Sequence, residues 1–379
     1  LKPPLIFSLK LLECFKIRDF KIRDFKSLGR KMKHFTGSYI FTVVGFILAW
    51  LWAEHIHQGS GFAALFIVLI LSILEISLSF DNAVVNAAKL EKMSPKWQHR
   101  FLTWGILIAV FGMRFLFPIC IVSIFSKVNV IKVIDMALND ADKYSYYLQV
   151  SHPAIITFGG AFLIMLFISY FFNHEKELHW IGFLEKKMAS CGHFKSIGII
   201  IALFCIYLTQ LFAPIEHKHQ IMAAGICGMI VYLLIDGFSH HLEMLNAKKK
   251  DDNSPCHSGF SLKNSCFINF LYLELIDASF SLDGVLGAFA LSKDVVIITL
   301  GLAIGAMFVR SLTILLVEKK TLKEYKYLEH GAHWAIGALA IIMFISANFE
   351  VSEIITGLIG FVFILVAFIT SLIENKKAA

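Results

Sequence analysis

Charged residues are scarce in this sequence. They make up 17% of its 379 residues, whereas soluble globular proteins carry roughly 25%. Hydrophobic residues make up 57%, phenylalanine occurs 36 times and the mean hydropathy is +0.71. This composition excludes an ordinary soluble domain and indicates a polytopic membrane protein.

Several signatures of soluble chemistry are missing too. None of the seven cysteines forms a CxxC pair, so we expect free thiols. No P-loop of the form GxxxxGK[ST] is present, which argues against ATP as an energy source. The HExxH and GxSxG motifs of hydrolases are absent as well, and we therefore expect no enzyme.

The N-terminal segment, 1–36, is basic and lacks the sustained apolar run of a signal peptide. It contains a five-residue duplication, KIRDFKIRDF, from Lys16 to Phe25. Two interpretations stay open. The segment is either a basic cytoplasmic helix on the anionic inner leaflet or an upstream sequence, with Met32 as the real start.

Apolar runs long enough to cross a bilayer, which takes roughly 20 residues each, occur about ten times. Lysine and arginine are enriched in alternate gaps between these runs. Because positive loops stay in the cytoplasm, we predict an integral plasma (inner) membrane protein with both termini cytoplasmic. The predicted runs lie near 37–54, 61–88, 101–125, 153–172, 196–213, 221–238, 267–291, 295–317, 332–347 and 354–373.

Two segments about two hundred residues apart share the pattern acid-x-Ser-x-Ser-x-Asp. EISLSFDNAVV begins at Glu75, and DASFSLDGVLG begins at Asp277. The next runs agree, because TWGILIAVFGMR, which ends at Arg114, has the spacing of TLGLAIGAMFVR, which ends at Arg310. Acids, serines and arginines are the uncommon residue types in these apolar runs, so the match indicates an internal repeat.

A third block supports the repeat, since GAFLIMLFIS from Gly160 resembles GALAIIMFIS from Gly337. Each repeat then has five crossings, and an odd number inverts the second half relative to the first. We predict an all-α polytopic bundle of two inverted five-helix repeats with a 3+3 core, covering 37–213 and 214–379. Such repeats recur among secondary transporters, whose sites lie near the midplane.

The acids of the repeat lie near the centres of their runs. A central Asp or Arg facing lipid costs roughly +2.5 to +3.5 kcal/mol, so these groups must face the interior, a cavity or each other. Glu75 and Asp81 are six residues apart, about 600° of turn, and one straight helix cannot aim both at one ion. Either the helix is interrupted, with Ser77 and Ser79 bonding the freed backbone groups, or each acid meets an acid of the other repeat.

We favour a combination in which Glu75 and Asp277 approach each other while Asp81 and Asp283 lie at the two ends. Carboxylates with the Asn82 amide form an all-oxygen set, which suits Mn²⁺, Mg²⁺ or Ca²⁺. The alternative is that the acids only pair with the arginines to hold helices together. The predicted metal-site residues are Glu75, Asp81, Asn82, Glu274, Asp277 and Asp283, supported by Ser77, Ser79, Ser279, Ser281, Arg114 and Arg310.

Outward movement of a dication against about 100 mV costs roughly 4.6 kcal/mol and needs coupling. Buried carboxylates can exchange a metal ion for protons, which favours proton antiport. We expect membrane lipid, a divalent metal ion and protons as partners, no nucleic acid and no permanently bound cofactor. A non-transporting accessory membrane protein is the runner-up function. Homo-oligomers and envelope-protein partners stay open.

Two weaker signals concern the predicted cytoplasmic side. Asp236 either lines an inner vestibule or faces the interface. A regulatory soft-metal site is an alternative to a solvated loop, although its spacing fits no zinc pattern. Its residues would be His240, His241, Cys256, His257 and Cys266.

The paired motifs resemble the TerC-like integral membrane proteins of the LysE exporter superfamily, in particular the branch catalogued as a domain of unknown function. The carriers are SLSFDNAVV with Glu75 ahead of it, LELIDASFSLDGV from Leu273, and the runs ending at Arg114 and Arg310. The likeness covers most of 35–375. It implies manganese export or tellurite resistance, with the six predicted metal-site residues at the family's acidic positions. This chain departs from simpler members of the family, which have fewer than ten crossings. The resemblance therefore implies the substrate less firmly than the fold.

Overall fold

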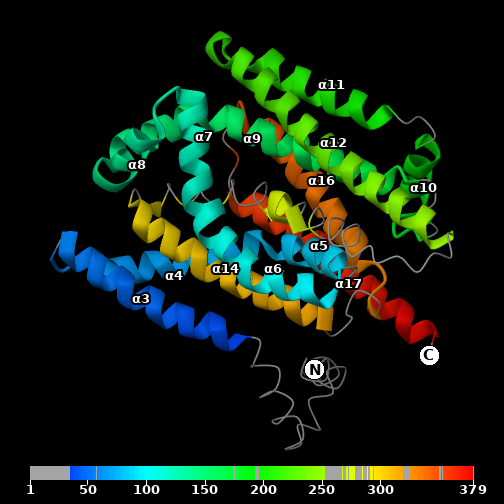
Figure 1. The fold of residues 1–379 in the computed structure, drawn as a ribbon, viewed down its shortest axis with the longest axis horizontal. Coiled ribbons are helices and arrows are strands. Elements are labelled where there is room, and N and C mark those ends of the chain that lie inside the picture. Colours follow the sequence, from blue (N-terminus) through cyan, green and yellow to red (C-terminus); the bar gives the residue numbers. More distant parts are fainter. Residues whose placement is uncertain are drawn as a thin grey trace, which may run out of the picture.

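A computed structural model of the chain shows an all-α protein (Figure 1), which confirms the predicted fold class. It describes residues 35–251 and 267–378, except for gaps at 57, 92, 174–175, 177, 193–195, 268–269, 272, 278–283, 285–287, 289–290, 293, 319–323, 350 and 352. Three predictions lie outside the described residues: the basic segment up to residue 34, the Cys256–Cys266 loop, and the side chains of His240 and His241.

Among the residues that the structure describes, seven helices are long and apolar enough to cross a membrane, and they correspond to seven of the ten predicted runs. The chain is therefore an integral membrane protein with multiple apolar helices, although ten crossings are not shown. The helices that hold these spans are α3 (Thr36–Ile56), α4 (Gly61–Leu78), α9 (Ala141–Phe171), α12 (Ile215–Asp251), α14 (Val295–Glu318), α16 (Leu328–Ser346) and α17 (Glu353–Ala378).

The remaining predicted runs differ from regular spans in three ways. Run 101–125 is helical throughout but irregular, because the π-helix η2 (Ile108–Leu116) joins α6 (Pro95–Leu107) to α7 (Phe117–Ser126). Run 196–213 becomes α11 (Ile197–Phe212), a shorter apolar helix. Run 267–291 lies mostly outside the described residues. Hydropathy identifies the length of an apolar run, but it does not predict whether the helix in that run is regular.

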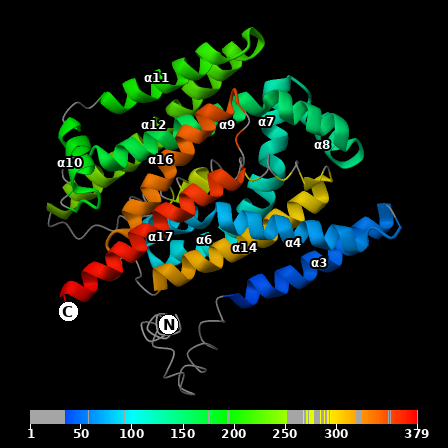
Figure 2. The ribbon, with the colours of Figure 1, turned by 180° about the vertical axis from the view of Figure 1, so that it is seen from behind.

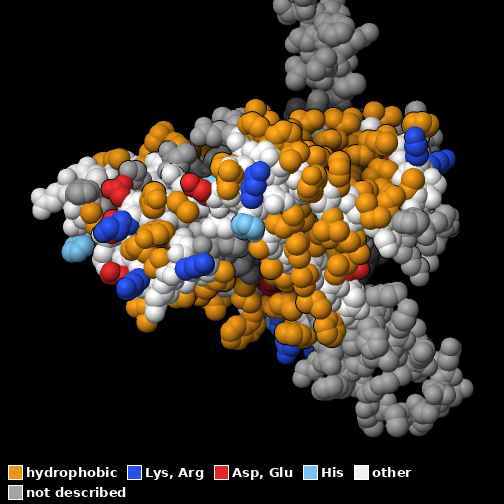
Figure 3. Space-filling model, turned by 90° about the horizontal axis from the view of Figure 1, so that it is seen from above, with side chains coloured by type: hydrophobic (Ala, Val, Ile, Leu, Met, Phe, Trp, Pro, Cys, Tyr) orange, Lys and Arg blue, Asp and Glu red, His pale blue; other side chains and the backbone are white. Residues whose placement is uncertain are grey.

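The outer surface has the character expected of lipid contact. On the face drawn in Figure 3, hydrophobic side chains fill the middle, whereas charged side chains gather mostly toward the ends. Over the whole surface, large apolar side chains such as Ile40, Phe62 and Phe212 are exposed. Exposed phenylalanine and isoleucine in such number suit a hydrocarbon solvent rather than water.

The helices form layers, as Figures 1 and 2 show from opposite sides. Helices α11 and α12 lie along one side and α3 along the other, with α9, α16, α5 (Phe80–Leu90) and α14 between them. The largest buried apolar cluster draws on α5, α9, α11, α12, α16 and α17. Short helices α8 (Val130–Asn139) and α10 (Gly182–Cys191) fill gaps between predicted runs.

Helices α9 and α16, which carry the third repeated block, pack through their equivalent glycines. A methyl group on Gly160 would lie 3.4 Å from the Ala340 carbonyl oxygen and 3.7 Å from the Phe344 ring. A methyl group on Gly337 would come within 2.6 Å of the Phe167 ring. Because Phe167 and Phe344 occupy equivalent repeat positions, the two contacts are reciprocal.

The four cysteines that the structure describes, Cys120, Cys191, Cys205 and Cys227, are free thiols. This agrees with the prediction from their spacing. Cys120 and Cys227 lie in apolar runs, and both are exposed. An apolar run does not reveal which of its faces meets lipid.

Candidate functional site

The helix that carries the first motif is interrupted at Ser79. Helix α4 ends at Leu78 and α5 begins at Phe80, with Ser79 at φ −101° and ψ 15° between them. The Ser79 hydroxyl donates to Glu75 Oε1 at 2.7 Å. The exposed Ser77 hydroxyl instead donates to its own helix, at Ile73 O. Of the two alternatives, the interrupted helix is therefore present, and Ser79 is the serine that contacts the acid.

Glu75 is buried against two elements distant in sequence. Its carboxylate forms an ion pair with Arg114, which η2 supplies. On the other side, Gly305 of α14 lies so close that a methyl group there would be 2.5 Å from Glu75 Cβ and 2.8 Å from Ser72 O. A methyl group on Gly284, in the second motif, would lie 3.0 Å from Glu75 Oε2. The first acid thus lies beside the second motif.

The second motif places two carboxylates beside one guanidinium group. Arg310 Nη2 lies 3.4 Å from Glu274 Oε1 and 3.9 Å from Asp277 Oδ2. Arg310 Nη1 also donates to the Phe101 carbonyl at 2.9 Å, and the guanidinium lies over the Phe101 ring. Gly105 leaves room for this pair, since a methyl group there would lie 2.6 Å from Glu274 Oε1.

A direct contact joins the two motifs. Asn82 Nδ2 donates to Asp277 Oδ1 at 2.7 Å, across 195 positions of sequence. The predicted approach of Glu75 to Asp277 stays a prediction. The other oxygens of the pair, Asn82 Oδ1 and Asp277 Oδ2, are buried and accept no hydrogen bond.

Asp81 lies in the first turn of α5, where the N-terminal end of the helix favours a carboxylate. Its Oδ1 accepts a hydrogen bond from Asn82 N at 2.9 Å, and its side chain is 4% exposed. Gly360 of α17 packs against Oδ2 at an ordinary distance. The matching residue of the second motif, Asp283, lies outside the described residues together with Ser279 and Ser281.

The site as described is rich in negative charge. Four buried carboxylates face two guanidinium groups, so full ionisation leaves two negative charges uncompensated. No group of three or more His, Cys, Asp or Glu side chains is placed to hold a metal ion among the described residues. Arginines hold Glu75, Glu274 and Asp277, which is the arrangement of the helix-holding alternative. A cation would have to draw these carboxylates away from their arginines.

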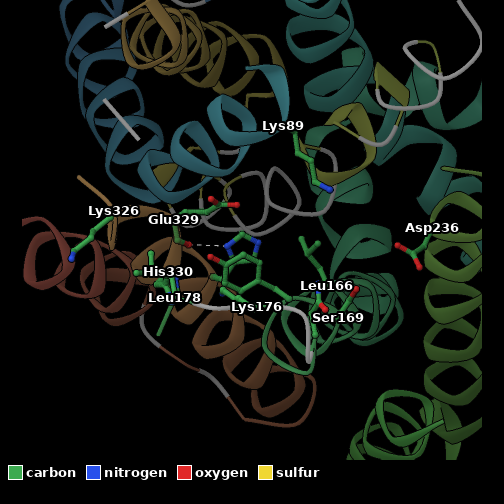
Figure 4. A pocket seen from close by; sticks show the side chains of 12 residues that line it. Lys89, Leu166, Ser169, Lys176, Leu178, Asp236, Lys326, Glu329 and His330 are labelled. Atoms are coloured by element: carbon green, nitrogen blue, oxygen red, sulfur yellow. Dashed lines mark hydrogen bonds between the residues drawn. The ribbon is translucent and has the colours of Figure 1, made fainter. Parts of the chain in front are cut away.

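A polar cavity of about 420 Å³ opens at the other end of α5 (Figure 4). Asp236 lines it, so of the two alternatives for this residue the vestibule is the one observed. Its lining comes from chain segments that end on the predicted cytoplasmic side. These residues are Lys89, Leu166, Ser169, Tyr170, Asn173, Lys176, Leu178, Asp236, Lys326, Glu329, His330 and His333.

Beneath the cavity, α10 is anchored by a buried carboxylate. Glu185 accepts hydrogen bonds from Trp180 N at 2.9 Å and Trp334 Nε1 at 3.1 Å, and its Oε2 lies 2.9 Å from His330 Nδ1. Burial raises the pKa of Glu185, but the hydrogen bonds from His330 and Trp334 outweigh it and lower the pKa to about 2. Burial likewise lowers the pKa of Lys176, at the cavity wall, to about 8.

Sequence reasoning missed Asn86 and Glu185. Asn86 lies one turn after Asn82, is 3% exposed, and has a carboxamide oxygen without a hydrogen-bond partner. Its i, i+4 spacing from Asn82 inside an apolar stretch was a usable signal. The sequence gives no such signal for Glu185. A glutamate in a charged segment between apolar runs looks like any solvent-exposed acid until its contacts are known.

Comparison with known proteins gives one match. A family model described as Protein of unknown function (DUF475) matches residues 80–378. The match begins at the first residue of α5 and includes the second motif, while Glu75 precedes it. No curated protein and no solved structure matches the chain. Because the model covers well over half of the sequence, this integral membrane protein belongs to the DUF475 family.

Proposed function

We propose that the protein is a secondary transporter that moves a hard divalent cation, with Mn²⁺ as the first candidate, in exchange for protons. The observation that carries this proposal is the contact between Asn82 and Asp277. It joins the two motifs at the α4–α5 break and leaves Asn82 Oδ1 buried without a hydrogen-bond partner. Asp277 Oδ2 also accepts no hydrogen bond and lies 3.9 Å from Arg310 Nη2. Buried acceptors are nearly always satisfied, so we propose that both oxygens accept a cation once Arg310 is displaced.

The charge of the site supports a divalent ion. Two negative charges remain when its four carboxylates and two arginines are all ionised. One dication or two protons would neutralise them equally. Because uncompensated charge is costly in the membrane, the empty ionised state is disfavoured, and cation and protons compete for the same carboxylates. That competition is the physical basis of antiport.

The ligand chemistry supports a hard ion. Carboxylates, the Asn82 amide and the Ser79 hydroxyl offer only oxygen donors, which suit Mn²⁺, Mg²⁺ or Ca²⁺. In the described state Arg114 and Arg310 occupy the carboxylates. We propose that cation binding displaces them, and that the arginines pair with the carboxylates again when the cation leaves, while protons neutralise the remaining negative charge.

The inverted-repeat architecture, with ten crossings, forms part of the proposal. The reciprocal contacts of Gly160 with Phe344 and of Gly337 with Phe167 are those expected beside a two-fold axis. Each repeat also supplies an acid–arginine pair, Glu75 with Arg114 and Asp277 with Arg310. In transporters of this design the substrate site lies where the halves meet.

Membership of the TerC-like group within the LysE superfamily is proposed on the motif resemblance alone. The family description states no function, so manganese export from the cytoplasm rests on that resemblance and on the oxygen ligands. Tellurite resistance remains an alternative physiological outcome. Moving a dication out of a negative compartment costs free energy, and coupling to proton entry would supply it.

Reconstitution of the purified protein in liposomes tests the proposal. We expect Mn²⁺ flux that depends on an imposed pH gradient, and we expect Asp81→Asn and Asp283→Asn each to abolish it while the proteins still express. Asp135→Asn is a matched control, because Asp135 is an exposed acid on α8. Flux that persists in both site variants would refute the assignment of the site.

The second candidate is an accessory membrane protein that supports metal loading or assembly of other envelope proteins. The observation that favours it is the capture of three acids by arginines, which makes the described state a closed, helix-holding network. It predicts metal affinity without flux in liposomes that contain only this chain. The pH-gradient assay therefore separates the two functions.

A further inference from the structure

We infer that the cation passes between the motif site and the 420 Å³ cavity along α5, with the Asn86 carboxamide oxygen as an intermediate ligand. This inference rests on the proposed function and deepens it by naming a route and a further binding residue. Its starting point is a second buried oxygen without a hydrogen-bond partner on the helix that already carries Asn82.

The geometry of α5 places the route. Asn82, Asn86 and Lys89 are spaced by four and three residues, so they share one face within about 60° and extend over roughly 10 Å of helix. Asn82 contacts the second motif, and Lys89 lines the cavity (Figure 4). Asn86 lies between them, and the other α5 positions from Ala83 to Ala88 are apolar.

The energetics favour a ligand at this oxygen. A buried acceptor without a donor destabilises the folded protein, and α5 holds two of them one turn apart, at Asn82 and Asn86. A partly dehydrated divalent cation, passing from one to the other, would satisfy both in turn. Carboxamide oxygens suit such a step, because they are neutral ligands that bind hard cations without holding them as tightly as carboxylates.

Charges around the cavity set its selectivity. Asp236 and Glu329 place carboxylates at the wall and attract cations, whereas Lys89 and Lys176 repel them. Lys326 pairs with Glu374 and His330 with Glu185. His333 Nδ1 lies 2.8 Å from its own helix carbonyl at Glu329, and Lys176 lies over the Tyr170 ring. Lys89 is the cavity-lining cation on the same helix as Asn86, so an entering dication must pass its positive charge.

Labelling of Asn86→Cys with a cationic, membrane-impermeant thiosulfonate tests the route without requiring transport. Peptide mass spectrometry identifies the modified thiol despite the native cysteines. We expect labelling in inside-out vesicles, slowed several-fold by Mn²⁺, and none in right-side-out vesicles. Ala88→Cys is the matched control, since it is buried on the same helix but points about 200° away, and it should stay unlabelled.

The results separate the route from the proposed function. Labelling with Mn²⁺ protection but no liposome flux would retain the route and remove the transporter. Flux without labelling at Asn86→Cys, labelling from the opposite side only, or protection by phosphate in place of Mn²⁺ would overturn the route. If Asn86→Cys does not fold, Asn86→Ala provides a second test, with an expected rise of about tenfold in the Mn²⁺ concentration for half-maximal flux. An unchanged value would also overturn it.

Discussion

The two motifs have matching sequences but different partners. In the first, Glu75 has its own arginine, Arg114, and Asp81 is held by a backbone N–H. In the second, Glu274 and Asp277 share Arg310, which also binds the Phe101 carbonyl and ring. The two motifs therefore contain the same chemical groups, and packing distributes them unequally. The first motif has a helix break and an acid held by a backbone N–H, whereas the second has two acids that share one arginine.

Substitution of each arginine should have the largest effect, and it tests whether the two motifs use their arginines differently. Loss of one partner from a buried ion pair costs about 3–5 kcal/mol. We expect Arg310→Met to lie at the upper end, because it strands two carboxylates, and Arg114→Met at the lower end, because it strands one. Denaturant unfolding of the detergent-solubilised protein measures both. Glu274→Gln added to Arg310→Met should recover part of the loss, and equal losses for both arginines would contradict the shared-arginine arrangement.

Glycine substitutions probe how tightly each acid is enclosed. Gly305→Ala should destabilise the protein by about 1–3 kcal/mol, because its methyl group would meet Glu75 Cβ and the backbone oxygen of Ser72. Gly360→Ala, beside Asp81, is the matched control, since its methyl group would lie 3.4 Å from Oδ2. Thermal unfolding should separate the two variants. A larger effect at Gly360 would show that Asp81 is the more enclosed acid.

A double-mutant cycle tests whether the motifs are energetically joined. For Asn82→Ala and Asp277→Ala we expect a coupling energy of about 0.5–1.5 kcal/mol, typical of residues in direct contact. The cycle is measured from the unfolding free energies of the two single variants and the double variant. Additive effects would mean that the 2.7 Å contact contributes nothing and that each motif is stabilised within its own repeat.

A pH-dependent effect is expected outside the motifs, at Glu185. Its folded pKa of about 2 is below the ordinary value of 4.5. A lowered carboxyl pKa contributes stability that is complete above the unfolded pKa and is lost as the pH falls toward the folded pKa. We therefore expect the unfolding temperature of the wild type to fall between about pH 4.5 and 2. Glu185→Gln should lack this component, and a parallel decline in both proteins would remove Glu185 as its source.

Most of the fold could be predicted from patterns within short windows. Seven predicted runs became candidate spans because hydrophobic length is a local property. The break between Glu75 and Asp81 was one of two alternatives, and the six-residue spacing already required it or a partner across the repeat. The π-helix that carries Arg114 was not predictable, because its backbone winding depends on the helices packed around it.

The sequence by itself determined that this protein is helical, lies in a membrane and carries duplicated acids and arginines in its apolar runs. Those features follow from composition and spacing, since a charge in an apolar run must find an interior partner wherever it lies. Only the tertiary structure decided the partners: Asn82 with Asp277, and Arg310 between two acids. It also buries the Asn86 carboxamide oxygen without a hydrogen-bond partner. Contacts between residues nearly two hundred positions apart depend on how whole helices pack, which no short stretch of sequence encodes.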